Sequence, residues 1–324
     1  MENNTQITNK ENFNSILPEK FIFICYASFE ERSCSIPSII ESRRITKSII
    51  LKSAEVDNKH SADKIREKID RAETHDLDLD NPVKIAETLT QIIEKLEKEN
   101  SCNLVIDVTT FTHEILLMLI KLIHSNKHIF PKVYCLYNGA DGYSVGDSTE
   151  HMWLSKGCRE VRNIIGYPGV IRPDCKTRLI LLTGFETERA TRLIELLEPD
   201  MISLGKGVEP INDNHIVPMK YFIDKLNEWI NNCKNNCETF DFSCKDVEQA
   251  ITSIENVINK HKNENLIIIP LNTKLSTIAT ALIAIKNPNI QVCYSIPEMY
   301  NTQNYSTPGD GITVVHLHEM EIYK

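Results

Sequence analysis

The stretch FIFICYASFEERS (21–33) decides the fold that we expect for the first half of the chain. Its first six residues are apolar or aromatic and indicate a short buried strand. The polar residues after Ala27 indicate a loop, followed by a helix that we expect to reach about Arg43. Further strands are expected at SIILKS (48–53), LVID (104–107) and VYCLY (133–137), with helices at about 59–72, from Pro82, and across FTHEILLMLIKLI (111–123). Strands that alternate with helices predict a parallel sheet covered on both faces.

The same order of elements recurs in the second half. RLILLT (178–183) predicts a strand, GFETER (184–189) a loop and ATRLIELL (190–197) a helix. Three pairs of residues recur at a spacing of 156 for the first and 162 for the other two: Phe29-Glu30 with Phe185-Glu186, Asn103-Leu104 with Asn265-Leu266, and Tyr143-Ser144 with Tyr305-Ser306. We therefore predict an α/β protein of two tandem Rossmann-like parallel-sheet units, related by internal duplication.

The boundaries of these units follow from the polar segments. Residues 1–18 are polar, lack the apolar core of a signal peptide, and are expected to form a loose leader. The first unit is expected to cover 19–171, including a short helix and a turn over 151–169. The second unit is expected to cover 172–324.

Composition limits the classes of function. The 324 residues carry a formal net charge of −9, which argues against a protein that coats nucleic acid. The ten cysteines have no paired spacing, and several lie in apolar runs, as free cysteines in a reducing compartment do. No apolar run reaches the roughly 18 residues that cross a bilayer. We therefore predict a cytoplasmic protein without a membrane partner.

The loop after the first strand of each copy is the first place to look for a ligand. In open parallel sheets, ligands bind outside the carboxyl ends of the strands, and each of these loops opens a helix whose free N–H groups attract anions. The candidate ligand contacts in these loops are Ser28, Glu30, Arg32, Gly184, Glu186 and Arg189. The two arginines could clamp a phosphate. Alternatively, each arginine pairs with the nearby glutamate in a structural role.

The loop after the central strand of the first copy, IDVTTFTHE (106–114), is the densest polar cluster beside an apolar strand. Asp107 ends the strand, and the helix start carries three hydroxyls, those of Thr109, Thr110 and Thr112. Such a loop suits a phosphate or a ribose, and helix capping by threonine is the alternative. If the site is catalytic, His113 and Glu114 are the candidate proton carriers.

The matching loop of the second copy, IIPLNTKLS (268–276), differs in chemistry. Ile269 replaces the carboxylate, and the loop gains Asn272, Thr273 and Lys274. These three residues could contact an anion, or they could cap the helix and face solvent. The difference predicts an asymmetric site or one degenerate copy.

Two further loops could contribute to a ligand site. The segments YNGADGYSVGD (137–147) and IPEMYNTQNYSTPGD (296–310) follow the last strand of each copy, and Tyr143 and Tyr305 could stack on a base. Packing of both rings against the core is the alternative. Leu204-Gly205-Lys206-Gly207 loosely resembles a phosphate-binding turn without a Walker pattern.

Metal and nucleophile sites are not expected. Cys233, Cys237 and Cys244 lack a fourth ligand at zinc spacing, and His316 and His318 are two ligands without a third. The chain has no G-x-S-x-G elbow and no G-x-G-x-x-G fingerprint, which argues against an NAD dehydrogenase. We predict no metal and no cofactor.

The two copies with their polar loops resemble the CARF family and its fused double form, SAVED. These are Rossmann-like sensors of cyclic nucleotides in bacterial antiviral defence. The resemblance implies ligand contacts from Ser28 to Arg32 and from Asp107 to His113. Asp107 and Thr109 match a D-x-T-x-G-T-K type loop, whereas residues 111–113 depart from it. No effector nuclease is appended, so the resemblance implies a separate effector protein as the partner.

The opening stretch FIFICYASFEERS is also similar to the first strand and loop of TIR domains. TIR enzymes that cleave NAD use a glutamate on a later helix, for which Glu73 and Glu87 are the candidates. Neither has supporting context, and the duplication fits TIR domains poorly.

These observations lead to one function hypothesis and two alternatives. We predict a nucleotide-binding sensor or regulator that holds a nucleotide-like anion between the two repeats. The first alternative is a hydrolase that acts on a cyclic nucleotide or a nucleoside derivative at the same cleft. The second is a protein-interaction scaffold.

Overall fold

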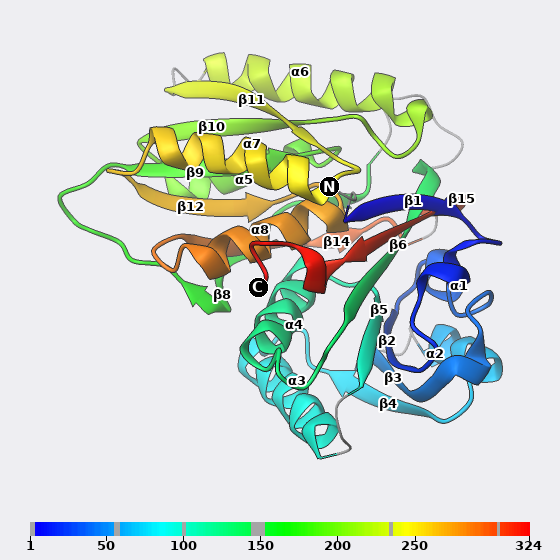
Figure 1. Cartoon of the computed structure of the whole chain (residues 1–324). Coiled ribbons are helices and arrows are strands. Elements are labelled where there is room, and N and C mark those ends of the chain that lie inside the picture. The colour runs from blue at the N-terminus through cyan, green and yellow to red at the C-terminus, as the bar shows by residue number, and fades with distance from the viewer. Residues whose placement is uncertain (1–3, 55–58, 99–101, 144–152, 233–235, 303–304) are drawn as a thin grey trace. The chain divides into compact units, whose positions relative to one another are not determined.

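The computed structural model describes residues 4–54, 59–98, 102–143, 153–232, 236–302 and 305–324 (Figure 1). The chain divides into two compact units. The first comprises Met1–Asp141 with Ser306–Lys324, and the second comprises Gly142–Tyr305. Each unit is built on one mainly parallel sheet with helices, so the predicted α/β fold class is confirmed. The boundary that the sequence predicts near residue 172 lies inside the second unit.

The sheet of the first unit has five parallel strands in the order β4-β3-β2-β5-β6. These strands are β2 (Phe21–Ala27), β3 (Ile45–Ser53), β4 (Ala72–Leu77), β5 (Asn103–Asp107) and β6 (Val133–Tyr143). Two strands extend the sheet beyond β6, first β15 (Ser306–His316) and then β1 (Thr5–Asn9). Every residue of β2 is buried, as expected of a central strand covered on both faces.

The helices of the first unit are α1 (Phe13–Ile16), α2 (Lys59–Lys68), α3 (Pro82–Glu97) and α4 (His113–Ser125), with 3-10 turns η1 (Glu31–Cys34), η2 (Ser42–Arg44) and η6 (Leu317–Glu319). Helices α3 and α4 pack against each other (Figure 1). The helix expected up to Arg43 is wrong, because only η1 and η2 form there. Pro37 would lie in the middle of that helix, where it lacks an N–H and its ring obstructs the preceding turn.

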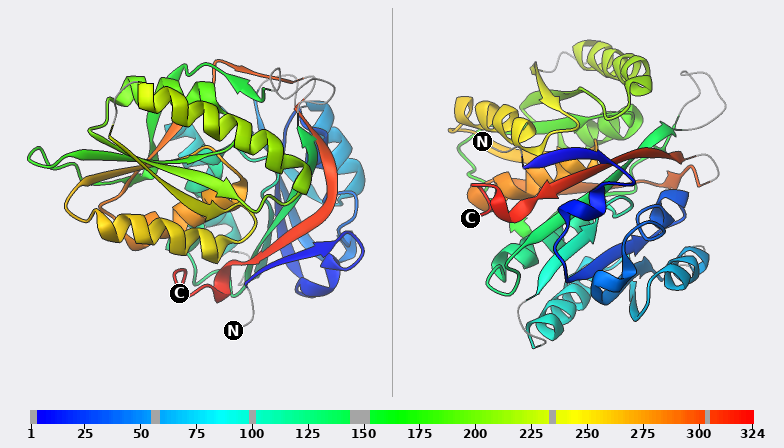
Figure 2. Two further views of the ribbon diagram at one scale, coloured as in Figure 1. Left: turned by 90° about the horizontal axis from the view of Figure 1, so that it is seen from above. Right: turned by 45° about the vertical axis from the view of Figure 1, so that its right-hand side comes forward.

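The sheet of the second unit repeats this order as β11-β10-β9-β12-β13. Its strands are β9 (Thr177–Thr183), β10 (Met201–Val208), β11 (Cys237–Ser243), β12 (Asn265–Pro270) and β13 (Gln291–Ile296), all parallel, followed by antiparallel β8 (Glu160–Pro168). A separate pair joins β7 (Ser155–Lys156) to β14 (Met299–Tyr300). The helices are α5 (Thr187–Leu197), η5 (Asp213–His215), α6 (Ile216–Asn232), α7 (Val247–Lys260) and α8 (Lys274–Lys286). Helix α5 contacts α6, and α7 contacts α8 (Figure 2).

The register of the central strands agrees with the spacing of the sequence repeats. Phe21 of β2 lies opposite Asn103 of β5, and Thr177 of β9 lies opposite Asn265 of β12. These positions are related by the same spacings, 156 and 162, as the repeated residue pairs. Equal strand order and equal register are the relation that internal duplication predicts.

The outermost parallel strand of each sheet was not expected. Strands β4 (AETHDL) and β11 (CETFDFS) are polar, and their side chains are mostly exposed or half-buried. An outer strand needs only part of its surface to be apolar, so the continuous apolar run that marks a central strand is absent. The short helix predicted over 151–169 is also wrong, because strands β7 and β8 occupy the described part of that segment.

The sixth strand of each sheet, β15 in the first and β8 in the second, comes from the chain that follows the parallel strands of the other unit. Strand β8 follows β6 in the sequence but pairs with β13 of the second unit. Strand β15 follows β13 and β14 in the sequence but joins β6 of the first unit. The five parallel strands of the first sheet therefore all precede those of the second in the sequence. The sixth strand of each sheet, in contrast, follows the parallel strands of the other sheet.

The segment expected as a loose leader is ordered where the structure describes it. Strand β1 pairs antiparallel with β15 from Thr5 opposite Val315 to Asn9 opposite Gly311. Phe13 is fully buried and Leu17 is nearly so, and both belong to the hydrophobic core that includes residues of β2. The low average hydropathy of residues 1–18 concealed these two anchors. Among the described residues, no helix combines the length and the hydropathy needed to cross a bilayer.

Phe13→Ala tests whether the N-terminal segment is part of the core. Because the ring is fully buried, its removal should lower the free energy of unfolding by about 3–5 kcal/mol. Urea denaturation measures this change. Lys10→Ala is the control, since this side chain lies on the surface and should cost at most about 0.5 kcal/mol. Equal stability of both variants and the wild type would restore the loose-leader interpretation.

Candidate functional site

In each sheet, the strand order reverses beside the first of the five parallel strands, β2 in the first unit and β9 in the second. In the first unit this point lies between β2 and β5, and in the second between β9 and β12. The loops that the sequence selected leave the carboxyl ends of these four strands. Open α/β sheets bind ligands at such a position.

The first unit has a buried ion pair in its first loop. Arg32 Nε lies 3.0 Å from Glu30 Oε2, and only 4% and 9% of the two side chains are exposed. Ser306 donates to the same carboxylate oxygen at 2.7 Å, and Arg32 Nη1 donates to the Asn138 carbonyl at 3.2 Å. Ser28 accepts a hydrogen bond from the Glu30 backbone at 3.0 Å and so shapes the loop.

The second unit has a buried ion pair of the same composition. Arg189 Nη1 lies 2.6 Å from Glu186 Oε2, and only 2% and 8% of the two side chains are exposed. Ser155 donates to the other oxygen of Glu186, and Arg189 Nη1 lies 3.3 Å from Ser155 Oγ. Arg189 Nη2 also donates to the carbonyl of Ser295.

The two arginines bond to equivalent carbonyls. Tyr134 lies opposite Val105, and Gln291 lies opposite Ile267, at corresponding positions of β6 and β13. Asn138 and Ser295 are each four residues further along these strands. Each guanidinium therefore joins the first loop of its unit to the fifth strand, which is the structural alternative considered for Arg32 and Arg189.

The three threonines of the central loop have separate backbone contacts. Thr109 Oγ1 accepts from the Asn138 N–H at 3.0 Å, and Thr110 Oγ1 donates to the Tyr26 carbonyl at 2.6 Å. Thr112 caps α4 by accepting from the Ile115 N–H at 3.2 Å. Capping thus explains one hydroxyl, and strand-to-loop contacts explain the other two.

Asp107 is the most unusual group of the first unit. It is 2% exposed at the end of β5, and its Oδ1 accepts from the Thr109 N–H at 3.0 Å. Burial raises the pKa of its carboxyl to about 7, although the hydrogen bonds from Thr109 and the charge of Arg32 act in the opposite direction. Asp107 lies opposite Cys25, and the equivalent Ile269 lies opposite Leu181. The fold therefore accepts an apolar side chain at this position, and a buried titratable group here is a candidate for function.

The proposed proton carriers lie in the first turn of α4. His113 is 8% exposed and Glu114 is 3% exposed. Both side chains are therefore largely buried. Glu73, considered for a TIR-like reaction, lies on β4 rather than on a helix, and pairs with Lys47 at 3.2 Å.

The corresponding loop of the second unit is also held by internal contacts. Asn272 Nδ2 donates to the Thr183 carbonyl at 2.6 Å, and Cys244 Sγ lies 3.2 Å from Asn272 Oδ1. Thr273 caps α8 by accepting from the Ser276 N–H, and Lys274 is the first helical residue. Gly184 is buried, and a Cβ there would lie 3.1 Å from Asn272 Nδ2.

The two candidate stacking tyrosines both belong to the second unit and contact aromatic neighbours. The Tyr143 ring lies 5.2 Å from that of Phe185 and 4.9 Å from that of His215. The Tyr305 ring lies 6.3 Å from that of Tyr300. Ser144, which completed one of the sequence repeats, lies outside the described residues.

A cavity of about 610 Å³ opens at the carboxyl ends of β10 and β11 in the second unit. Its apolar wall is formed by Val208, Pro210, Ile216, Met219 and Ile223. Its charged lining residues are three lysines and four acids, Lys206, Lys220, Lys245, Glu209, Asp213, Asp224 and Asp241. Lys206 lies 3.3 Å from Asp241, and Lys245 lies 4.0 Å from Glu209. Within the described part of the chain, the Lys220 ammonium has no carboxylate partner.

Gly207 leaves room for two side chains from the loops after β11 and β12. A Cβ at this position would lie 2.6 Å from Cys244 Sγ and 2.7 Å from Asn272 Nδ2. The sequence signal for this region was Gly205-Lys206-Gly207, which is part of strand β10 and not a phosphate-binding turn. The apolar wall was missed, because Ile216, Met219 and Ile223 have the spacing of any amphipathic helix.

The described ranges contain no group of three or more histidine, cysteine or acidic side chains placed to hold a metal ion. Cys233, one of the three cysteines considered for zinc, lies outside the described residues.

No protein-family model matches the chain, and no curated protein matches it in sequence. Among solved structures, the chain is similar to the binary complex of leucoanthocyanidin reductase with NADPH from Vitis vinifera. The identity is 10% and the TM-score is 0.26, over 82% of this chain and 88% of the other.

Arg189→Met tests the structural role of the buried pair. It leaves the Glu186 carboxylate buried without its partner, so the free energy of unfolding should fall by about 3–5 kcal/mol. Arg192→Met is a matched control on the same helix, because Arg192 pairs with Glu195 at the surface and should cost at most about 1 kcal/mol. Urea unfolding compares them, and equal losses would contradict the structural role.

Asp107→Asn tests the titration of the buried carboxyl. Because its pKa rises from 3.8 to about 7 on folding, the stabilisation is complete below pH 4 and is lost as the pH rises through 7. The variant should lack this loss, which amounts to about 1.4 kcal/mol for each unit of pKa shift. Its stability relative to the wild type should therefore increase between pH 4 and pH 8.

Urea unfolding at a series of pH values measures this difference. Glu67→Gln is the control, since Glu67 is exposed in the same unit. Parallel pH profiles for Asp107→Asn and the wild type would show that folding does not raise the pKa of Asp107.

Proposed function

We propose that the protein is a sensor that binds a nucleotide-like ligand in the cavity at the carboxyl ends of β10 and β11. The observation that carries this proposal is the combination of an apolar wall with a charged rim in one cavity of about 610 Å³. Binding sites for small molecules are usually mostly apolar, with a few polar groups that orient the ligand. Ile216, Met219 and Ile223, from one face of α6, form a wall suited to the flat side of a base.

The charged rim favours a ligand that carries both hydroxyl groups and an anion. Glu209 and the neighbouring aspartates can accept hydrogen bonds from ribose hydroxyls. Lys220 can contact a phosphate, because no carboxylate among the described residues neutralises it. A simple inorganic anion would contact only the lysines. The carboxylates, which outnumber the lysines, would then have no partner from the ligand.

The proton carriers that the sequence suggested lie outside this cavity. The cavity lining contains lysine, aspartate and glutamate but no histidine among the described residues. His113 and Glu114, the candidate catalysts of the hydrolase alternative, do not line this cavity. The resemblance to CARF and SAVED proteins supports a sensor in antiviral defence with a separate effector protein. The free state of every described cysteine supports a cytoplasmic location.

A thermal-shift screen against mono-, di- and cyclic oligonucleotides tests the sensor. A ligand that binds only the folded state raises the melting temperature by mass action. Ile216→Glu places a charge on the apolar wall and should weaken binding about tenfold or more, since burial of such a side chain is worth about 1.5–3 kcal/mol. Val217→Glu is the matched control, because Val217 is the next residue of α6, is 71% exposed and does not line the cavity.

Three outcomes are distinguishable. A shift that Ile216→Glu removes and Val217→Glu retains, with the ligand recovered intact, supports the sensor. Recovery of breakdown products would replace the sensor with the hydrolase. The absence of any shift would favour the scaffold, which predicts a stable complex with another protein.

A further inference from the structure

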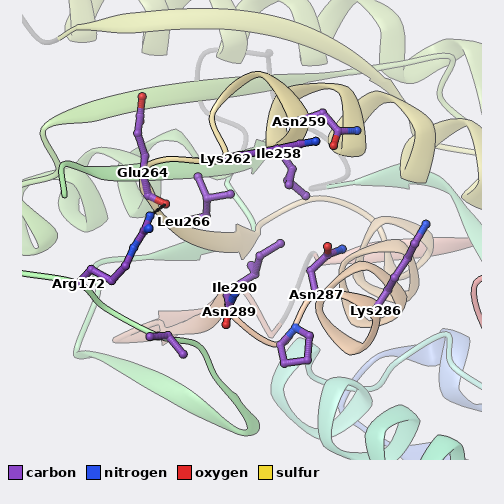
Figure 3. A pocket seen from close by; sticks show the side chains of 12 residues that line it. Arg172, Ile258, Asn259, Lys262, Glu264, Leu266, Lys286, Asn287, Asn289 and Ile290 are labelled. Carbon is purple, nitrogen blue, oxygen red and sulfur yellow. Dashed lines mark hydrogen bonds between the residues drawn. The ribbon is translucent and has the colours of Figure 1, made fainter.

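A second cavity lies in the second unit, at the amino ends of the strands and not at their carboxyl ends. It has a volume of about 520 Å³ and lies at the amino ends of β12 and β13 (Figure 3). Its walls come from three separate segments, the chain after β8, the end of α7 and the turn between α8 and β13. None of the candidate ligand contacts identified from the sequence lies in it.

The floor of this cavity is apolar and its rim is polar. Ile258, Leu266 and Ile290 are each less than 9% exposed and form the floor. Asn259, Asn287 and Asn289 line the rim and offer amide groups. Figure 3 shows Arg172 beside Glu264 on one side of the cavity, with Lys286 and Asn287 on the other.

The charges of the rim are predominantly positive. Arg172, Lys262 and Lys286 line the cavity with one acid, Glu264. The Glu264 carboxylate is already bound by the buried Arg178, at 2.7 and 3.1 Å, and is therefore neutralised. This excess of cations occurs in a chain whose formal net charge is −9.

The three cations differ in what places them at the rim. Lys286 lies in the last turn of α8, and Lys262 follows the C-cap of α7, so each is placed where a cation also complements a helix dipole. Lys286 pairs with Glu255 at 2.8 Å, whereas Lys262 has no carboxylate partner among the described residues. Arg172 comes from the segment after β8, away from both helices, and its guanidinium donates to the Glu264 carbonyl at 3.5 Å. The helix dipoles therefore do not account for Arg172.

We propose that this cavity binds a small phosphorylated molecule, with its phosphate held by Arg172 and Lys262 and its apolar part on the floor formed by Ile258, Leu266 and Ile290. Guanidinium and ammonium groups are the side chains that recognise phosphate in proteins. The asparagine amides can add neutral hydrogen bonds to the same group. This site is independent of the cavity beside β10 and β11.

Titration calorimetry with inorganic pyrophosphate tests this site in the full-length chain. We expect saturable binding of one pyrophosphate at this cavity. Lys262→Glu and Arg172→Gln should each weaken it about tenfold or more, because each removes a charge-assisted contact. Both side chains are exposed, so both variants should keep the melting temperature of the free wild-type protein.

Two control variants distinguish binding at this cavity from general charge attraction and from binding at the cavity beside β10 and β11. Lys68→Glu makes the same change in net charge at an exposed position of the first unit and should leave binding unchanged. Ile216→Glu alters the other cavity and should also leave it unchanged. The inference is overturned if the wild type shows no saturable binding, if Lys68→Glu weakens binding as much as Lys262→Glu, or if Ile216→Glu abolishes it. Failure of the nucleotide screen would leave all of these expectations in place.

Discussion

The buried glutamate–arginine pair at the carboxyl edge of each sheet is the constraint on which this architecture depends. A buried pair adds little net stability, because desolvation offsets the attraction, but removal of one partner is costly. Arg32 and Arg189 must therefore stay bonded to Glu30 and Glu186, and each also bonds to a carbonyl at the same register position of the fifth strand. Ser306, the first residue of the chain returning to the first unit, completes one pair. The pairs therefore hold the loops after β2 and β9 in place. They also hold the segments around Ser306 and Ser155, which are distant in sequence from the loops that they contact.

This constraint changes where ligand chemistry can occur. A guanidinium that holds a carboxylate and a carbonyl has fewer donors left for a phosphate, and the threonines after β5 are bonded to backbone groups. Ligand contacts from these residues would require the breaking of internal bonds. The carboxyl ends of β10 and β11 carry no such pair among the described residues, and a cavity with an apolar wall remains there. We therefore favour this end of the second sheet over the predicted loops.

The sequence predicted the features that depend on local pattern. The central strands follow from apolar runs, and the register of Asn103 and Asn265 agrees with their spacing. Features that depend on distant partners were missed. Phe13 is an isolated aromatic residue in a polar segment, and its burial becomes evident only with the core around β2. The exchange of β8 and β15 leaves no local trace, since the alternation of side chains along a strand does not indicate which sheet the strand joins. Arg32 was identified as a candidate from the sequence, but its partner Ser306 was not, because the two residues are 274 positions apart.

The difference between Asp107 and Ile269 shows how two similar sheets acquire different chemistry. Both side chains are buried at the same register position, so the sheet itself requires no carboxyl there. A carboxyl whose pKa lies at about 7 is protonated in part at neutral pH, and its ionised form is disfavoured by burial. Structural need alone would favour an apolar side chain, which carries no desolvation cost. The first unit has a titratable group where the second has an apolar side chain. This asymmetry argues that the two units have different roles on the same strand order.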